Sequence, residues 1–326
     1  MKANKGVRIS LMVFVAILAI AFLFSGIAVA KTRISIGTGG SGGVFYVLGA
    51  GAAKIINDKS DNLQASAQST AATTENINLV SKRRGLDFAF VVFSSAYDAY
   101  AGEGNFTGKQ KDDVRLVMFG HLGLMAPTAL KKIGITEIAQ AKGKRVAMSP
   151  GSLGKKLTVE AYAGSDLTLD DFSSSPVLSY TEMVAALKDG TIDVGMIHAA
   201  HPTSSILDIA AMKNIVILKQ NDASQAKIME RNPTWLPATI PADTYRGVDY
   251  DVKTLATPYA IIASEKVPED IVYEFIKTVM ESNDELVEVH KAGRFYTKDH
   301  IGYDKKPAVP FHAGAEKYLK EVGAIK

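Results

Sequence analysis

A glycine-rich loop is the part of this sequence whose residues could best do chemistry. The run Thr38-Gly39-Gly40-Ser41-Gly42-Gly43 follows a short β-type stretch and precedes an apolar segment of helical length. Glycine lets the backbone approach a ligand closely and adopt positive φ angles. The helix that follows brings its unpaired N–H groups and the positive end of its dipole to the same place. The pattern predicts a cradle for an anion or a carboxylate.

Four further loops of small polar residues follow strand-like runs. They are residues 69–74, 94–95, 149–154 and 198–202. Ligands of open α/β sheets bind beyond the carboxyl ends of the strands, so we expect all five loops to line one cleft. No arginine lies in any of them. We therefore expect N–H groups, hydroxyls and helix dipoles, rather than an arginine fork, to hold a carboxylate.

The segments that must position these loops alternate between strand-like and helical patterns. Strands are predicted at 33–37, 63–68, 87–93, 145–148, 177–179, 193–197 and 215–218, and helices at 44–59, 73–81, 96–101, 152–163, 181–187 and 202–211. This succession favours an α/β fold with a parallel sheet covered by helices. We expect two lobes, joined by the long apolar segments 116–130 and 252–262. Helices at 269–281 and 284–291 would return to the first lobe.

The first thirty residues have the pattern of a secretory signal peptide. Lys2, Lys5 and Arg8 precede an apolar run, and Ala28-Val29-Ala30 fits the small-residue cleavage rule. We expect cleavage after Ala30 and a periplasmic mature protein. A retained membrane anchor is the alternative, because the apolar run is nearly long enough to span a bilayer.

Charge and cysteine content exclude several classes of function. Residues 1–30 hold three of the 37 basic residues and no acidic residue, so 34 of each sign remain after cleavage. This balance gives no reason to expect binding to nucleic acid or to a membrane surface. The chain has no cysteine, which excludes disulfides, thiolate catalysis and cysteine-ligated zinc.

Several segments, in this order, resemble the TAXI family of solute receptors that serve tripartite ATP-independent periplasmic (TRAP) transporters. They are IGTGGSGGVFYVLGAGAAKIIN, TENINLV, AYDAYAGEGNFTG, KGKRVAMSPGSLG, ALKDGTIDVGMI, LPATIPADTYRGVDYDV and FHAGAEKYLKEVG. The resemblance implies a monomeric receptor that captures a small carboxylate or amino acid and delivers it to TRAP permease subunits driven by an ion gradient. Characterised relatives bind glutamate, related amino acids or 2-oxo dicarboxylates. The resemblance implies no catalysis, cofactor or metal.

The resemblance also implies a fold and its domain boundaries. The fold is a two-lobed periplasmic binding protein, type II-like, in which each lobe has a mixed, mostly parallel sheet flanked by helices. Residues 1–30 would be the signal peptide, 31–117 and 253–326 a discontinuous first lobe, and 118–252 the second lobe. The ligand would bind in the cleft between the lobes.

Site residues carried over from the resemblance lie in the five loops and on the helices next to them. Where relatives have glycines before the helix at 73–81, this chain has Ala71 and Ala72. The ligand-binding candidates are Thr38, Gly39, Ser41, Gly42, Phe45, Tyr46, Thr73, Asn76, Phe93, Ser94, Ser95, Tyr97, Ser149, Gly151, Ser152, Gly154, His198 and His201.

Two histidines at a predicted strand-to-helix junction have more than one interpretation. His198 and His201 lack a nearby third ligand, so a metal site is not expected. An imidazole at the end of a strand can hydrogen-bond a ligand or pack in the core, and both uses stay open for His198. His201 is expected at a helix start, with Pro202 in the first turn.

Three other function classes compete with the receptor. Ser152 and Lys155 match the S-x-x-K pattern of an exported serine hydrolase, without the other motifs of that class. Gly37-x-Gly39-x-x-Gly42 fits a dinucleotide fingerprint, but the next strand ends at Gln68-Ser69 without the expected acidic residue. A structural or adhesive surface protein is disfavoured because the sequence has no repeats.

Overall fold

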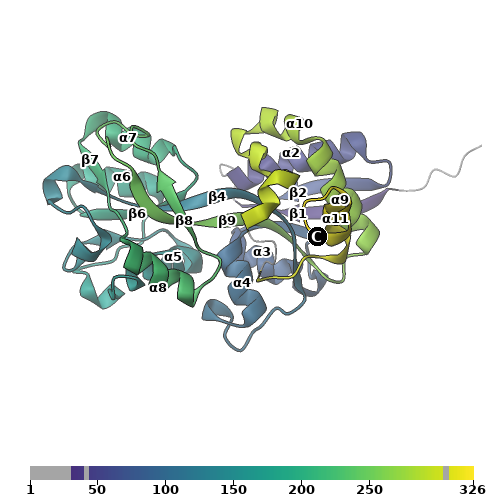
Figure 1. Cartoon of the computed structure of the whole chain (residues 1–326), viewed down its shortest axis with the longest axis horizontal. Coiled ribbons are helices and arrows are strands. Elements are labelled where there is room, and N and C mark those ends of the chain that lie inside the picture. Colours follow the sequence, from purple (N-terminus) through teal and green to yellow (C-terminus); the bar gives the residue numbers. More distant parts are fainter. Residues whose placement is uncertain (1–30, 40–43, 304–307) are drawn as a thin grey trace, which may run out of the picture. The chain divides into compact units, whose positions relative to one another are not determined.

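Two long strands lie side by side through the middle of the structure (Figure 1). Strand β4 spans Val114–Leu130 and strand β9 spans Val252–Ser264. They pair antiparallel from Val114↔Ser264 to Leu124↔Ala256, with two register shifts. The structure is a computed structural model that describes residues 31–39, 44–303 and 308–326. Residues from Arg33 onward form one compact unit.

The other strands extend this pair into a mixed sheet of order β2-β1-β3-β9-β4-β6-β5, with β7 paired to β4 and β8 to β9. Pairs β1–β3 and β5–β6 are parallel, whereas β3–β9, β4–β6, β4–β7 and β8–β9 are antiparallel. The bounds are β1 Thr32–Gly37, β2 Leu63–Gln68, β3 Phe88–Val92, β5 Val146–Ala147, β6 Val194–Ala199, β7 Ile215–Ile217 and β8 Leu236–Ile240. The α/β class and the mixed sheet are confirmed, but most of the strand pairs that the structure describes are antiparallel, whereas the sequence predicts mostly parallel ones.

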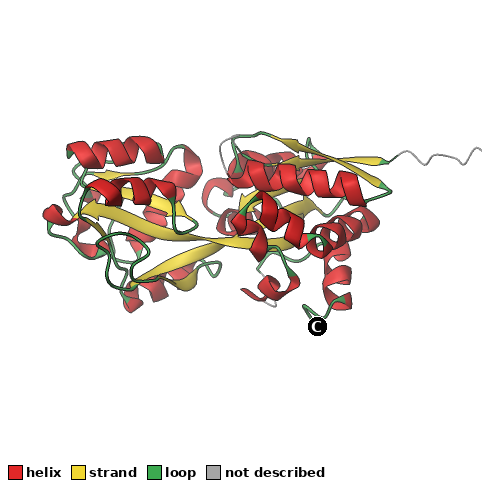
Figure 2. Cartoon of the chain, turned by 90° about the horizontal axis from the view of Figure 1, so that it is seen from above, coloured by secondary structure: helices red, strands yellow, loops and turns green. Residues whose placement is uncertain are grey.

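Helices lie on both sides of the strands (Figure 2). Their bounds are α2 Val44–Lys59, α3 Thr73–Val80, α4 Phe93–Ala101, α5 Gly151–Ala163, α6 Tyr180–Asp189, α7 Ser204–Met212, α8 Asp222–Arg231, α9 Glu269–Glu281, α10 Asn283–Val289 and α11 Ala313–Glu321. Short 3-10 helices are Ser81–Arg83, Gly104–Phe106, Lys131–Ile133, Ile138–Ala141, Leu169–Asp171, Lys291–Phe295 and Lys298–Tyr303.

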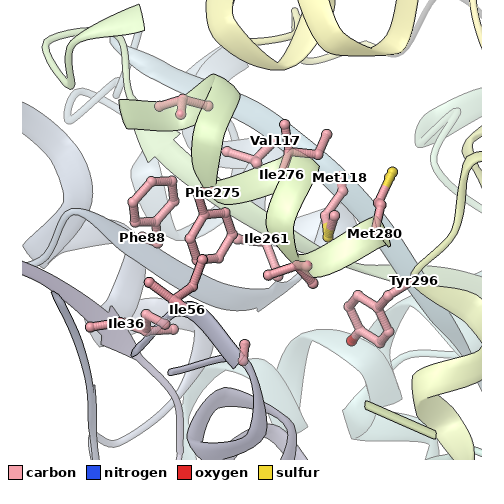
Figure 3. Close-up of a cluster of buried hydrophobic side chains, with 14 of the residues drawn as sticks. Ile36, Ile56, Phe88, Val117, Met118, Ile261, Phe275, Ile276, Met280 and Tyr296 are labelled. Carbon is pink, nitrogen blue, oxygen red and sulfur yellow. The ribbon is translucent and has the colours of Figure 1, made fainter. Parts of the chain in front are cut away.

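The buried apolar side chains form four clusters that divide along the sequence. Two clusters draw their buried members from residues 34–119 and 260–319. The other two draw theirs from residues 125–255. Figure 3 shows one of the first pair, in which the rings of Phe88 and Phe275 stack with centroids 4.0 Å apart. The lobe boundaries, 31–117 with 253–326 and 118–252, stay a prediction.

Three predicted elements are wrong in the structure. Helix α4 begins at Phe93, so Ser94 and Ser95 lie in its first turn and not in a loop. Helix α7 begins at Ser204, with Thr203 as its N-cap residue, so Pro202 precedes the helix and is not in its first turn. Residues 177–179 form a single bridge, Met148↔Val177, and no strand. Elements α8, β8 and α11 were not predicted.

Candidate ligand-binding site

A cavity of about 520 Å³ lies where most of the predicted polar loops meet. Its volume is in the range of sites for small ligands. Strands β4, β6 and β9 contribute His121, His198, Ala199 and Tyr259, and α10 is followed by His290. The rest of the lining is Gly39, Val44, Phe45, Ala72, Thr73, Val92, Ser149, Pro150, Leu153, Gly154, Leu157, Tyr180, Ala200, Pro202, Thr203 and Ser204.

The first turns of five helices reach this cavity. The lining residues concerned are Val44 in α2, Thr73 in α3, Leu153 in α5, Tyr180 in α6 and Ser204 in α7. The first turn of a helix has backbone N–H groups without intrahelical partners, and the dipole places partial positive charge there. Five such ends at one cavity create an environment that favours a negative charge.

Three of these helices leave their first N–H groups without a side-chain cap. The N-cap residues of α3, α5 and α7 are Ala72, Pro150 and Thr203, and none makes a capping hydrogen bond through its side chain. Helix α6, by contrast, is capped by Ser179 and Glu182. A capping side chain would compete with a ligand for the same donors. Helices α5 and α7 therefore keep donors that an anion can use.

The backbone is strained at Ala72, the N-cap residue of α3. Its φ is 65° and its ψ is −149°, a combination that is otherwise adopted almost only by glycine. Such a residue costs of order 1–3 kcal/mol and persists only where its surroundings hold it. Ala72 also lines the cavity. The strained turn aims the start of α3 at the site.

The described lining of the cavity contains no Lys, Arg, Asp or Glu. The polar groups are hydroxyls, imidazoles and backbone groups. Burial lowers the pKa of His121 to about 3 and that of His198 to about 3, so both rings are neutral at physiological pH. That a carboxylate is held without an arginine fork stays a prediction.

His198 is held in place by the residues around it. It is 5% exposed, and its backbone N–H donates to the Tyr180 hydroxyl, which in turn donates to the His198 carbonyl at 2.7 Å. The Tyr259 hydroxyl lies 3.5 Å from His198 Nδ1. A Cβ on Gly123 would lie 2.5 Å from His198 Cε1, so only glycine fits beneath the ring. The side chain both packs in the core and forms part of the cavity wall.

Aromatic rings form another part of the wall. The rings of Phe45 and Tyr259 meet edge to face with centroids 5.1 Å apart, and those of His121 and Tyr259 with centroids 4.5 Å apart. His121 Nδ1 lies 3.2 Å from the Tyr296 hydroxyl. Sequence reasoning missed His121 and Tyr259 because it interpreted β4 and β9 only as connections. Histidine inside the apolar run 116–130 was the available signal.

A model of the NMT1-like family matches residues 36–323. The chain belongs to the NMT1-like family. This NMT1-like protein is similar in structure to XAC2383 from Xanthomonas citri bound to ATP, with a TM-score of 0.51 and 9% identity over 90% of this chain and 96% of that one. The likeness shows a shared fold, and the predicted α/β fold is confirmed.

Two solved structures of sulfonate-binding proteins match with lower scores. One is the periplasmic aliphatic sulphonate binding protein SsuA from Escherichia coli, with a TM-score of 0.49 and 15% identity over 90% of this chain and 85% of that one. The other is the alkanesulfonate-binding protein SsuA from Xanthomonas axonopodis pv. citri bound to MOPS, with a TM-score of 0.48 and 15% identity over 89% and 84%.

Six of the ligand-binding candidates line the cavity of this NMT1-like protein: Gly39, Phe45, Thr73, Ser149, Gly154 and His198. They come from both halves of the sequence, and the structure brings them together. Gly154 is required by close packing, because a Cβ there would lie 1.9 Å from the Ser149 carbonyl oxygen. Their role as ligand contacts stays a prediction. Ser41, Gly42 and the side chain of Ser152 lie outside the described part of the structure.

The side chains of Thr38 and Asn76 donate hydrogen bonds to backbone carbonyls and do not line the cavity. The Thr38 hydroxyl donates to the Gln68 carbonyl at 2.7 Å. The Asn76 amide donates to the carbonyls of Thr38 and Phe90, each at 2.7 Å. Both side chains are fully buried. They fix the strand end from which the glycine loop starts.

The other candidates do not line the cavity. Phe93 packs edge to face against Phe119 with centroids 4.8 Å apart. His201 Nδ1 shares a hydrogen bond of 2.5 Å with the Tyr245 hydroxyl, which also accepts from the Thr203 N–H. Burial lowers the pKa of His201 to about 4, so its ring is neutral as well. Those remaining are buried Ser94 and Ser95, half-buried Tyr46 and Tyr97, and exposed Gly151.

A second hollow, of about 460 Å³, lies along the opposite side of α5. It is lined by charged residues that include Asp98, Lys155, Lys156 and Glu160. Within the described chain, no three His, Cys, Asp or Glu side chains are grouped closely enough to hold a metal ion. No helix in that part of the chain has the length and apolarity needed to cross a membrane.

Proposed function

We propose that this protein is an extracytoplasmic receptor that captures a small carboxylate and delivers it to a membrane permease. The observation that carries the proposal is the convergence of five helix N-termini on one cavity of about 520 Å³. The partial positive charge at these helix starts stabilises an anion without a cationic side chain, and the uncapped ends of α5 and α7 add N–H donors. No reactive side chain is needed for this function.

The resemblance to the TAXI family supports a more specific partner and ligand class. The permease would be of the TRAP type, driven by an ion gradient. The resemblance implies a glutamate-like ligand or a 2-oxo dicarboxylate, both of which fall within the class of small carboxylates proposed above. The exported chain would be periplasmic, would begin at Lys31 after cleavage following Ala30, and would act as a monomer.

Two lobes closing on the ligand would couple capture to delivery. We place the first lobe at 31–117 and 253–326 and the second at 118–252, as the sequence predicts. Lining residues come from both ranges, for example Thr73 from the first and Ser149 from the second. A ligand that touches both sets favours the closed state, because only the closed state offers all the contacts.

The serine hydrolase is the alternative from another class. Its general base would be Lys155, which is exposed and lines the second hollow, not the cavity at the helix starts. The two functions make different predictions for purified protein. A receptor shows a ligand-dependent rise in melting temperature without turnover, and native mass spectrometry should find a co-purified acid. Steady turnover of an ester or a lactam that Ser152→Ala abolishes would overturn the receptor.

A further inference from the structure

The chemistry of the cavity lining discriminates among small carboxylates. The lining offers donors at the helix starts and hydroxyls such as those of Thr73 and Ser149, but its described residues include no carboxylate. The described lining favours a negative charge and offers no counter-charge for an ammonium group.

An ammonium group would be poorly accommodated here. A buried charge without an opposite partner is destabilised by several kcal/mol, whereas a paired one can be tolerated. The helix dipoles that favour a carboxylate also repel a cation at the same place. Both effects act against the zwitterionic form of an amino acid.

Much of the remaining wall is apolar. Phe45 and Tyr259 present rings, Leu153 and Leu157 lie along the first turns of α5, and Val44 lies at the start of α2. Apolar surface of this kind gains about 25 cal/mol per Å² when a hydrocarbon body covers it. A second carboxylate on the ligand would face this wall and lose its hydration without gaining a cation.

We propose that the ligand is a monocarboxylate with an apolar body and no ammonium group, such as a branched-chain 2-oxo or simple carboxylic acid. The inference rests on the proposed receptor function and selects one class within it. Glutamate and 2-oxoglutarate are then poor ligands, the first for its ammonium group and both for their second carboxylate.

The test compares probes that differ by one charged group. Calorimetry with the mature protein measures dissociation constants for 4-methyl-2-oxopentanoate, L-leucine, 2-oxoglutarate and L-glutamate. The 2-oxo monocarboxylate is expected to bind at least about 100-fold more tightly than leucine, the equivalent of the several kcal/mol for an unpaired buried charge. Equal or tighter binding of leucine, glutamate or 2-oxoglutarate overturns the inference and leaves the receptor intact. Failure of all four probes overturns the inference and counts against the proposed function too.

A pair of variants at Ala200 tests the charge argument directly. Ala200 lines the cavity and is partly exposed, so a slightly larger side chain can be placed there. Ala200→Asp adds a negative charge, and Ala200→Asn adds nearly the same shape without it. We expect the Asp variant to bind 4-methyl-2-oxopentanoate about 100-fold more weakly than the Asn variant, the effect of two like charges that come within about 6 Å of each other at an effective dielectric constant of about 20.

The same pair should shift selectivity toward amino acids. The ratio of the leucine to the 4-methyl-2-oxopentanoate dissociation constant should fall in the Asp variant relative to the Asn variant, because the new carboxylate can pair with the ammonium group. Melting temperatures of the free variants check that both fold. Equal affinities and ratios for two folded variants would overturn the proposal.

Discussion

Lys156 Nζ in α5 lies 2.9 Å from Asp98 Oδ2 in α4. Both side chains are largely buried, with 11% and 8% of their surfaces exposed. Lys156 also lies 3.3 Å from Glu160 Oε1, and Glu160 accepts hydrogen bonds from Trp235 Nε1 and Asn232 Nδ2. The pair joins a helix from the 34–119 part of the sequence to the helix whose first turn reaches the cavity.

Lys156→Met should destabilise the protein by about 3 kcal/mol, because removal of one partner leaves the other charge buried without compensation. The urea unfolding midpoint measures the loss. Lys155→Met is the matched control, since Lys155 is exposed and its loss should cost no more than about 0.5 kcal/mol. In a double-mutant cycle, the variant with both Lys156→Met and Asp98→Asn should lose less unfolding free energy than the two single variants lose together. Strict additivity would show that the pair contributes no coupling.

Ligand binding should compact the protein and tighten the contact between α4 and α5. Small-angle scattering with and without a saturating bound carboxylate measures the radius of gyration, which we expect to fall. The Asp98→Asn variant should show a weaker ligand affinity, by about tenfold or less, since it loses a contact that favours the closed state. An unchanged radius at saturation would mean that the site is preformed.

Ala72→Gly should stabilise the protein by about 1 kcal/mol. The gain from relieving a strained φ, of order 1–3 kcal/mol, exceeds the entropy that glycine adds to the unfolded chain, about 0.4–1 kcal/mol. Thermal and urea unfolding measure the change. Ala71→Gly is the control, because Ala71 has no positive φ and the added chain entropy should leave that variant no more stable than the parent. A destabilised Ala72→Gly variant would contradict the strain argument.

Stability should fall as the pH drops from about 6.5 toward 4, in part because of His121. Burial lowers its pKa from 6.5 to about 3 in the folded state, so the unfolded chain takes up a proton first within this window. Protonation of the unfolded chain then favours unfolding, by up to about 1.4 kcal/mol per pH unit. His121→Gln should reduce the slope of unfolding free energy against pH by about one proton. Identical slopes for parent and variant would contradict the neutral, buried ring.

The affinity of the site should depend on Gly154. A Cβ there would lie 1.9 Å from the Ser149 carbonyl oxygen, which is backbone and cannot rotate away. Gly154→Ala should therefore displace the start of α5 and weaken ligand binding by at least about tenfold, with some loss of melting temperature. Gly134→Ala is the control that separates a loss of stability from a loss of affinity. Gly134 lies at a surface turn with a φ of 77°, and an added Cβ there would have nothing within 4 Å. It should lose stability without losing affinity.

The sequence by itself determined the local elements and one end of the cavity lining. Helices α2 and α9 and strand β2 have the bounds that their apolar patterns predict, 44–59, 269–281 and 63–68. These patterns are local, because side-chain periodicity along one element decides which face it buries. The sequence also predicted that Gly39 lies at the cavity, because Gly39 follows a strand, and ligand sites of open α/β sheets lie beyond the carboxyl ends of the strands.

Only the tertiary structure decided which polar groups remain for a ligand. Thr38 and Asn76 look like ligand contacts in the sequence, yet their hydrogen bonds go to backbone carbonyls. His121 and Tyr259 lie in long apolar strands and become part of the wall because β4 and β9 pair and turn these residues to one side. Distant segments compete for each donor and acceptor once they are packed together, and no local pattern in the sequence records the outcome of that competition.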